Sequence, residues 1–287
     1  MASKYGLIDS TMPVAAFAQA RMAERFPPST SSVMDLESTE TKRPDLLSKF
    51  ILAKSAHPEF MNDALVTTMA ISMAFAGSET TAISLSSVFY YLLKNPHCMT
   101  RLLEEIDNSA FEDQQNGLVT WSEAQQLEYL DAVIKEAFRV HPAAGLPLER
   151  IVPPQGADIA GHFIPGGTIV GVSAWVLHRN KSIFGENIDA FCPERWLVDP
   201  SKDGEEEKKR INTMTGTLFH FGMGSRTCIG KNISLLEIYK LVPAVLRRFE
   251  VRLEDEEKDW TLHNAWFVRQ LGFRTLFRQR ELLGMGK

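Results

Sequence analysis

The sequence feature that most constrains this chain is a glycine-rich turn with one cysteine, between residues 219 and 234. Gly222 and Gly224 precede Cys228, and Gly230 follows it. Glycine adopts positive φ without strain and lets the backbone come close to a flat ligand. An apolar helical pattern follows at once, so Cys228 precedes a helix N-terminus, where free N–H groups and the helix dipole favour a thiolate. The turn therefore predicts a cysteine that holds a metal, although a chance glycine-rich loop around a core cysteine is the alternative.

The spacing within this turn matches a known motif. The pattern F-x-x-G-x-R-x-C-x-G is met by Phe221, Gly224, Arg226, Cys228 and Gly230. It resembles the haem-ligand loop of the cytochrome P-450 superfamily. The resemblance implies that the Cys228 thiolate is the axial ligand of the iron of haem b, and that Arg226 pairs with a haem propionate. It also implies that the other residues of the turn bind the cofactor, namely Phe221, Gly222, Gly224 and Gly230.

A second feature is a long apolar pattern from about residue 61 to residue 93. At a rise of about 1.5 Å per residue, it predicts a helix about 50 Å long. Residues 64–93 are long enough to cross a membrane. Their many serine and threonine side chains instead favour a helix buried on most sides in the protein core.

The middle of this helix carries a polar motif. Gly77 weakens the helix, and the Thr80 hydroxyl can bond back to the carbonyl of Ala76, so we expect a bend and a polar notch. The segment resembles the oxygen-activation motif of the same superfamily. That resemblance implies that Glu79 and Thr80 supply protons to dioxygen, while Ala76 and Gly77 leave room for it. From the residues alone, Glu79 could equally pair with a structural cation.

A third motif lies on a helix predicted over residues 128–140. Glu136 and Arg139 are three residues apart and share one helix face. In this position they resemble the E-x-x-R motif of the superfamily, which a later arginine completes, here Arg195 in the segment 191–196. The resemblance implies a structural role for the three residues. Two arginines would neutralise a buried carboxylate and fix a loop against the haem side of the core.

The remaining pattern predicts a mainly α protein with small β-sheets, in the α+β class. We expect β-like segments at 148–152, 158–164 and 168–174, and a second small sheet from 251–253 and 274–279. Residues 197–215 form a polar excursion. We divide the chain into residues 1–44, a helix over 14–25 and a disordered loop remnant, and residues 45–287, a single haem-binding domain in which Asp45 caps the first helix.

Composition excludes several classes of function. The net charge is −5, and basic residues are dispersed, so nothing indicates a nucleic-acid partner. The 3 cysteines are odd in number and far apart, which fits a reducing compartment without disulfides. The chain contains neither G-x-G-x-x-G nor a Walker motif, so electrons would have to come from another protein.

The superfamily resemblance runs in order from residue 45 to residue 280, including the long central helix. The segments 145–150 and 162–165 fit its fungal, eukaryotic microsomal type. It implies the C-terminal part of a haem-thiolate monooxygenase in secondary metabolism. Such an enzyme inserts one oxygen atom of O2 into a lipophilic small molecule, with electrons from NADPH–cytochrome P-450 reductase. The family implies the cytosolic face of the endoplasmic reticulum; because we find no anchor or signal in this sequence, the cytoplasm is the alternative.

Two other functions stay open. A haem-thiolate isomerase or peroxygenase would need no reductase, but such relatives usually depart from the acid–threonine pair that Glu79 and Thr80 provide. A truncated, inactive or merely haem-binding fragment is the second alternative. The resemblance implies that this chain lacks the membrane anchor, the N-terminal strands and the helices that cover the substrate pocket. The residues that remain indicate an apolar substrate and nothing finer.

Overall fold

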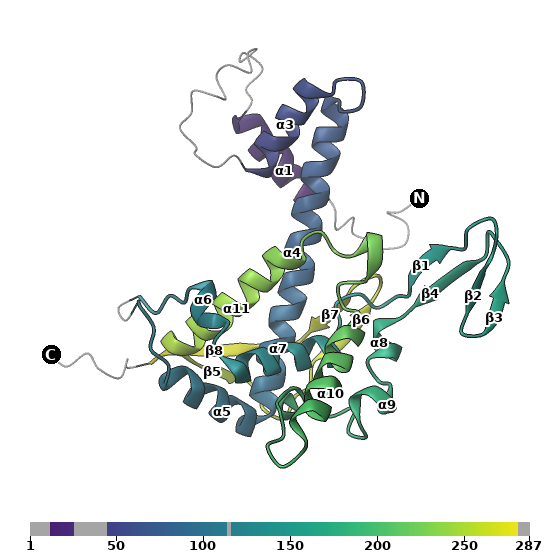
Figure 1. Ribbon diagram of the computed structural model, residues 1–287. Coiled ribbons are helices and arrows are strands. Elements are labelled where there is room, and N and C mark those ends of the chain that lie inside the picture. Colours follow the sequence, from purple (N-terminus) through teal and green to yellow (C-terminus); the bar gives the residue numbers. More distant parts are fainter. Residues whose placement is uncertain (1–11, 26–44, 114–115, 281–287) are drawn as a thin grey trace. The chain divides into compact units, whose positions relative to one another are not determined.

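The computed structural model describes residues 12–25, 45–113 and 116–280. The chain forms two compact units, Met1–Glu79 and Thr80–Lys287 (Figure 1). The first unit contains helix α1 (Met12–Arg25), helix α3 (Leu46–Ala56) and the beginning of α4 (Asp63–Lys94). As predicted, Asp45 caps α3, because its carboxylate accepts a hydrogen bond from the Ser48 amide at 2.9 Å. The loop predicted up to residue 44 lies outside the described residues.

Helix α4 is the predicted long helix, but it is buried over only part of its length. Most of its side chains from Thr81 onward are buried or half-buried, whereas most of those from Leu65 to Thr80 are only half-buried and residues 76–78 are exposed. The prediction of burial on most sides is therefore wrong at residues 76–78. The hydroxyls near the start of the helix need no tertiary partner, because Thr67 and Thr68 donate to the carbonyls of Asp63 and Ala64, both at 2.9 Å. Among the described helices, none combines the length and apolar character that a membrane crossing needs.

The core of the second unit is built by the end of α4 and by helices α5 (Pro96–Asp107), α6 (Trp121–Ala124), α7 (Glu128–Val140) and α11 (Lys231–Arg248). Their apolar faces meet in a continuous buried cluster, which includes Leu92, Leu102, Leu130, Ile134, Ile238 and Leu246. The first turn of α7 is held by Glu105 of α5, which accepts the Tyr129 and Leu130 amides at 2.7 and 3.0 Å. This cap fixes the start of the helix that carries Glu136 and Arg139.

Within the described residues, the β structure consists of two-stranded antiparallel sheets. They pair β1 (Leu148–Ile151) with β4 (Ile169–Val172), β2 (Ala157–Ile159) with β3 (His162–Ile164), β5 (Phe249–Leu253) with β8 (Thr275–Gln279), and β6 (Thr261–Asn264) with β7 (Val268–Leu271). The predicted class, mainly α with small sheets, is confirmed. The β6–β7 hairpin was not predicted.

The connection from the sheets to the cysteine turn is more helical than expected. It runs through α8 (Ala174–Leu177), α9 (Lys181–Phe184), η2 (Pro193–Trp196), α10 (Gly204–Thr217) and η3 (Gly224–Arg226). The prediction of a polar excursion at 197–215 is therefore wrong for much of this segment, because helix α10 begins at residue 204 and continues beyond residue 215. Asp203 caps α10 by accepting the Glu205 and Glu206 amides, both at 3.0 Å.

Candidate functional site

The cysteine turn adopts a conformation that only glycine takes without strain. Gly222 and Gly224 have φ of 66° and 70°, in the left-handed region. The Cys228 amide donates to the Phe221 carbonyl at 2.8 Å, which closes the turn on itself. Cys228 forms no disulfide and its side chain is exposed. The turn therefore presents a free thiol on a backbone held by local hydrogen bonds.

The surroundings of the Cys228 thiol combine a cation with apolar side chains. Arg226 is exposed and forms no ion pair with any residue that the structure describes. A Cβ placed on Gly230 would stand 3.8 Å from the Cys228 sulfur, so the backbone passes the sulfur at van der Waals distance. Ile229 and Ile233 are 85% and 55% exposed. The turn thus offers a sulfur, a positive charge and an apolar surface to a ligand.

The predicted oxygen-side motif lies on α4. Ala76 and Gly77 are exposed, and Glu79 and Thr80 are half-buried. A Cβ placed on Gly77 would meet nothing within 4 Å, outside its own helix backbone and chain neighbours. Ala76, Gly77 and Glu79 belong to the first unit, whereas Thr80 begins the unit that contains Cys228.

One hydrogen bond joins α4 to the helix that follows the cysteine turn. The buried Thr81 hydroxyl lies 2.9 Å from the hydroxyl of Ser234 in the first turn of α11. Figure 1 shows α11 beginning beside α4. The neighbour of Thr80 is therefore fixed to the helix that Cys228 precedes. Sequence reasoning missed this pair, because two hydroxyls so far apart in the chain carry no joint signal.

Glu136, Arg139 and Arg195 lie together in the second unit. Glu136 and Arg139 are fully buried, and the Arg139 guanidinium donates through Nη2 and Nε to the two Glu136 oxygens at 2.7 and 2.8 Å. Arg195 Nε donates to the same carboxylate at 3.3 Å. Trp196 Nε1 and the Cys192 amide also donate to it, at 2.8 and 3.0 Å. These donors satisfy both oxygens of the buried Glu136 carboxylate inside the core.

The two arginines also bind loop carbonyls. Arg139 donates to the carbonyls of Ile188 and Ala190 at 2.6 and 2.9 Å, and Arg195 donates to those of Phe184 and Asn187. The cluster therefore ties α7 to the segment that leads into η2. Sequence reasoning named the charged members but missed Trp196, whose indole N–H completes the shell around Glu136.

Two buried histidines, His141 and His178, and the half-buried His220 were missed by sequence reasoning. Burial lowers the pKa of His141 and of His178 to about 4, and it also lowers the pKa of His220. The Nε2 of His141 donates to the Val268 carbonyl at 3.0 Å, while its Nδ1 has no partner among the described residues. A second proton on His141 would enter an aromatic environment between Trp175 and Trp260.

These histidines predict a pH dependence of stability. The folded pKa lies below the ordinary value of 6.5, so the unfolded chain binds more protons as the pH falls below 6.5, and the free energy of unfolding decreases. We expect His141 and His178 each to contribute a slope of up to about 1.4 kcal/mol per pH unit between roughly pH 6 and 5. In urea unfolding, the free energy of unfolding of His141→Gln should change less steeply with pH than that of the parent chain. The exposed control His162→Gln should show the same pH dependence as the parent. Equal slopes in His141→Gln and the parent would contradict the assignment.

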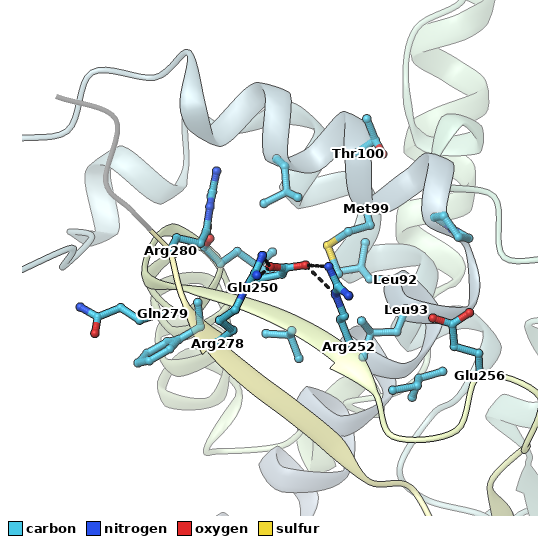
Figure 2. A pocket seen from close by; sticks show the side chains of 16 residues that line it. Leu92, Leu93, Met99, Thr100, Glu250, Arg252, Glu256, Arg278, Gln279 and Arg280 are labelled. Atoms are coloured by element: carbon cyan, nitrogen blue, oxygen red, sulfur yellow. Dashed lines mark hydrogen bonds and ion pairs between the residues drawn. The ribbon is translucent and has the colours of Figure 1, made fainter.

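A pocket in the second unit lies away from the predicted site residues. It lies between the end of α4, the first part of α5 and the β5–β8 sheet, as Figure 2 shows. Its volume is about 740 Å³. Glu250 pairs across its mouth with Arg252 and Arg278. None of the predicted site residues lines this pocket. The cysteine turn is therefore the candidate site because of its chemistry, and this pocket is not part of it.

Comparison with known proteins gives consistent matches. A family model described as Cytochrome P450 matches residues 19–275. Cytochrome P450 monooxygenase cicH of Emericella nidulans is 47% identical over 236 residues, which cover 82% of this chain and 46% of that protein. Pisatin demethylase of Fusarium vanettenii is 44% identical over 194 residues, which cover 68% of this chain and 36% of that protein. The chain spans about half the length of the curated relatives it matches, for example 46% of cicH and 46% of a cytochrome P450 monooxygenase of Aspergillus terreus.

Proposed function

This chain belongs to the cytochrome P450 family, and we propose from this that it forms the iron-ligand part of a haem-thiolate monooxygenase. The observation that carries the proposal is the exposed Cys228 thiol in a turn whose glycines adopt positive φ. The reaction class is insertion of one oxygen atom of O2 into a lipophilic small molecule. The similar proteins are monooxygenases of fungi, which supports a role in secondary metabolism.

The residues of the turn fit haem b. Cys228 is the iron ligand in this proposal, and its sulfur is free of other bonds. Arg226 would meet a propionate, and it has no carboxylate partner among the described residues that would compete. The left-handed Gly222 and Gly224 would keep side chains away from a flat macrocycle. When bound, the haem supplies the activation of dioxygen, which protein side chains cannot perform.

The other predicted residues would serve this cofactor from α4, α7 and η2. Thr80 and Glu79 would hold and transfer protons at their hydroxyl and carboxylate oxygens. Ala76 and Gly77 would leave space beside them, which is supported by the open space at Gly77. Glu136, Arg139 and Arg195 would act structurally, since their side chains bind one another and backbone carbonyls.

We further propose that NADPH–cytochrome P-450 reductase supplies the electrons, at the cytosolic face of the endoplasmic reticulum. The family implies a redox partner, which supports this part of the proposal. We also propose that residues 1–44 are separate from a haem-binding part that begins at residue 45.

A relative is named pisatin demethylase, which supports demethylation as one form of the reaction.

Turnover with a defined probe tests this function. The haem-loaded chain, NADPH and a fungal reductase should convert 7-methoxycoumarin to its fluorescent phenol, with one atom of ¹⁸O₂ appearing in the released formaldehyde before solvent exchange. Thr80→Val, which removes the hydroxyl at nearly equal volume, should lower this rate by about 10²-fold. Turnover driven only by hydrogen peroxide would favour the peroxygenase alternative. Haem uptake without either activity would favour a fragment that only binds haem.

A further inference from the structure

His178 lies at the junction of α7, α8 and the cysteine turn. It follows α8 directly and is completely buried. Its Nδ1 donates to the carbonyl of Arg139 at 3.1 Å, and its Nε2 accepts the amide of Phe219 at 2.8 Å. Arg139 in turn reaches back through Nη1 to the carbonyl of His178 at 3.3 Å. One imidazole therefore joins the helix of the charged cluster to the first residue of the turn.

Only one form of the ring can make both bonds. The Phe219 amide is a donor and the Arg139 carbonyl is an acceptor, so the neutral Nδ1–H tautomer is required. Burial lowers the pKa of His178 to about 4, and the nearby positive charges of Arg139 and Arg179 contribute to this lowering, so the neutral form persists at ordinary pH. No side chain without both a donor and an acceptor reproduces the bridge.

The bridge reaches Cys228 through the backbone of the turn. The Phe219 carbonyl accepts the Gly222 amide at 2.9 Å, and the Phe221 carbonyl accepts the amide of Cys228 itself at 2.8 Å. Between these bonds, the ring of His220 stacks on Phe138 of α7 with centroids 4.1 Å apart. The turn is thus anchored at Phe219 and supported by Phe138, while Cys228 and its neighbours are exposed.

We propose that His178 is a positioning residue for the Cys228 ligand, holding the start of the turn against the end of α7 so that the sulfur keeps its ligating position. This inference rests on the proposed function of Cys228 as an iron ligand. It also connects the Glu136–Arg139–Arg195 cluster to the ligand, through the hydrogen bonds of the neutral His178 imidazole. His178 acts through the backbone and touches neither cofactor nor substrate in this proposal.

The test compares two substitutions by amide hydrogen exchange in the 287-residue chain without haem. His178→Phe keeps an aromatic ring but removes both hydrogen bonds, whereas His178→Gln retains a donor and an acceptor. The readout is the exchange rate of residues 219–230 relative to that of β5, which lies in the same unit. We expect this ratio to rise about tenfold or more in His178→Phe and to return to within about threefold of the parent in His178→Gln.

A second readout is the ferrous–CO spectrum after haem loading. The fraction that shows the red-shifted thiolate band should fall in His178→Phe and recover in His178→Gln, while the exposed control His162→Gln leaves it unchanged. An unchanged exchange ratio in His178→Phe, equal acceleration in the turn and in β5, or no recovery in His178→Gln would each overturn the proposal. If the parent chain shows no thiolate band at all, the proposed function fails, and the exchange ratio still decides whether His178 holds the turn.

Discussion

Glu136→Ala is expected to reduce the free energy of unfolding by about 3 to 5 kcal/mol, because it leaves two buried arginines without their carboxylate. Arg139 is fully buried, and Arg195 is nearly so. The indole of Trp196 and the amide of Cys192 would lose their acceptor as well. Urea unfolding followed by far-UV circular dichroism measures the loss. For a domain of ordinary stability, this loss would leave much of the protein unfolded.

The matched control for this change lies on the same helix. Glu128 is an exposed residue of the first turn of α7, and Glu128→Ala should change the free energy of unfolding by no more than about 0.5 kcal/mol. Glu136→Gln should lie between the two, since it keeps the shape of the side chain and two acceptor lone pairs but removes the charge. A loss in Glu136→Ala as small as that in Glu128→Ala would contradict the role of the cluster.

Cys228→Ala is expected to abolish the thiolate band of the ferrous–CO complex, the second large effect. The thiolate band requires a cysteine sulfur on the iron, and alanine has no atom that replaces the sulfur of Cys228. The fold should be unaffected, because the Cys228 side chain is exposed and the hydrogen bond that closes the turn comes from its backbone amide. Unfolding in urea should therefore be nearly unchanged, while the thiolate spectrum disappears.

Cys192→Ser is the control for the cysteine substitution. Cys192 is half-buried, and its thiol lies 3.7 Å from the carboxylate of Glu194, where a serine hydroxyl can donate in its place. This variant should retain the thiolate band in full. Survival of the band in Cys228→Ala, or its loss in Cys192→Ser, would show that another cysteine binds the iron.

Local sequence patterns predicted most helices and strands because their signals are local. The helix α4 and the strands β5 and β8 carry the expected periodicity, and Asp45 carries the capping signal. Helix α10 was missed for the converse reason. It has few buried apolar side chains and is stabilised by Asp203 at its cap and by ion pairs such as Arg210 with Glu207, at 2.7 Å. Hydrophobic periodicity does not detect such a helix.

The residues of the candidate site also divide into those with a local sequence signal and those without one. The cysteine turn and the Glu136–Arg139 pair are contiguous motifs, so the amino-acid sequence alone suffices to name their residues. His178 and the Thr81–Ser234 bond could not be named in this way, because their partners lie far away in the chain and their residue types are common. The lower burial of α4 before Thr81 also escaped prediction, since hydroxyls that bond to their own helix need no packed neighbour.

The most direct test of the account is the ferrous–CO spectrum of this chain after reconstitution with haemin. We expect stoichiometric haem uptake and a red-shifted thiolate band that depends on Cys228. Uptake without that band in the folded parent chain, or a band unaffected by Cys228→Ala, would contradict the assignment of Cys228 as the iron ligand.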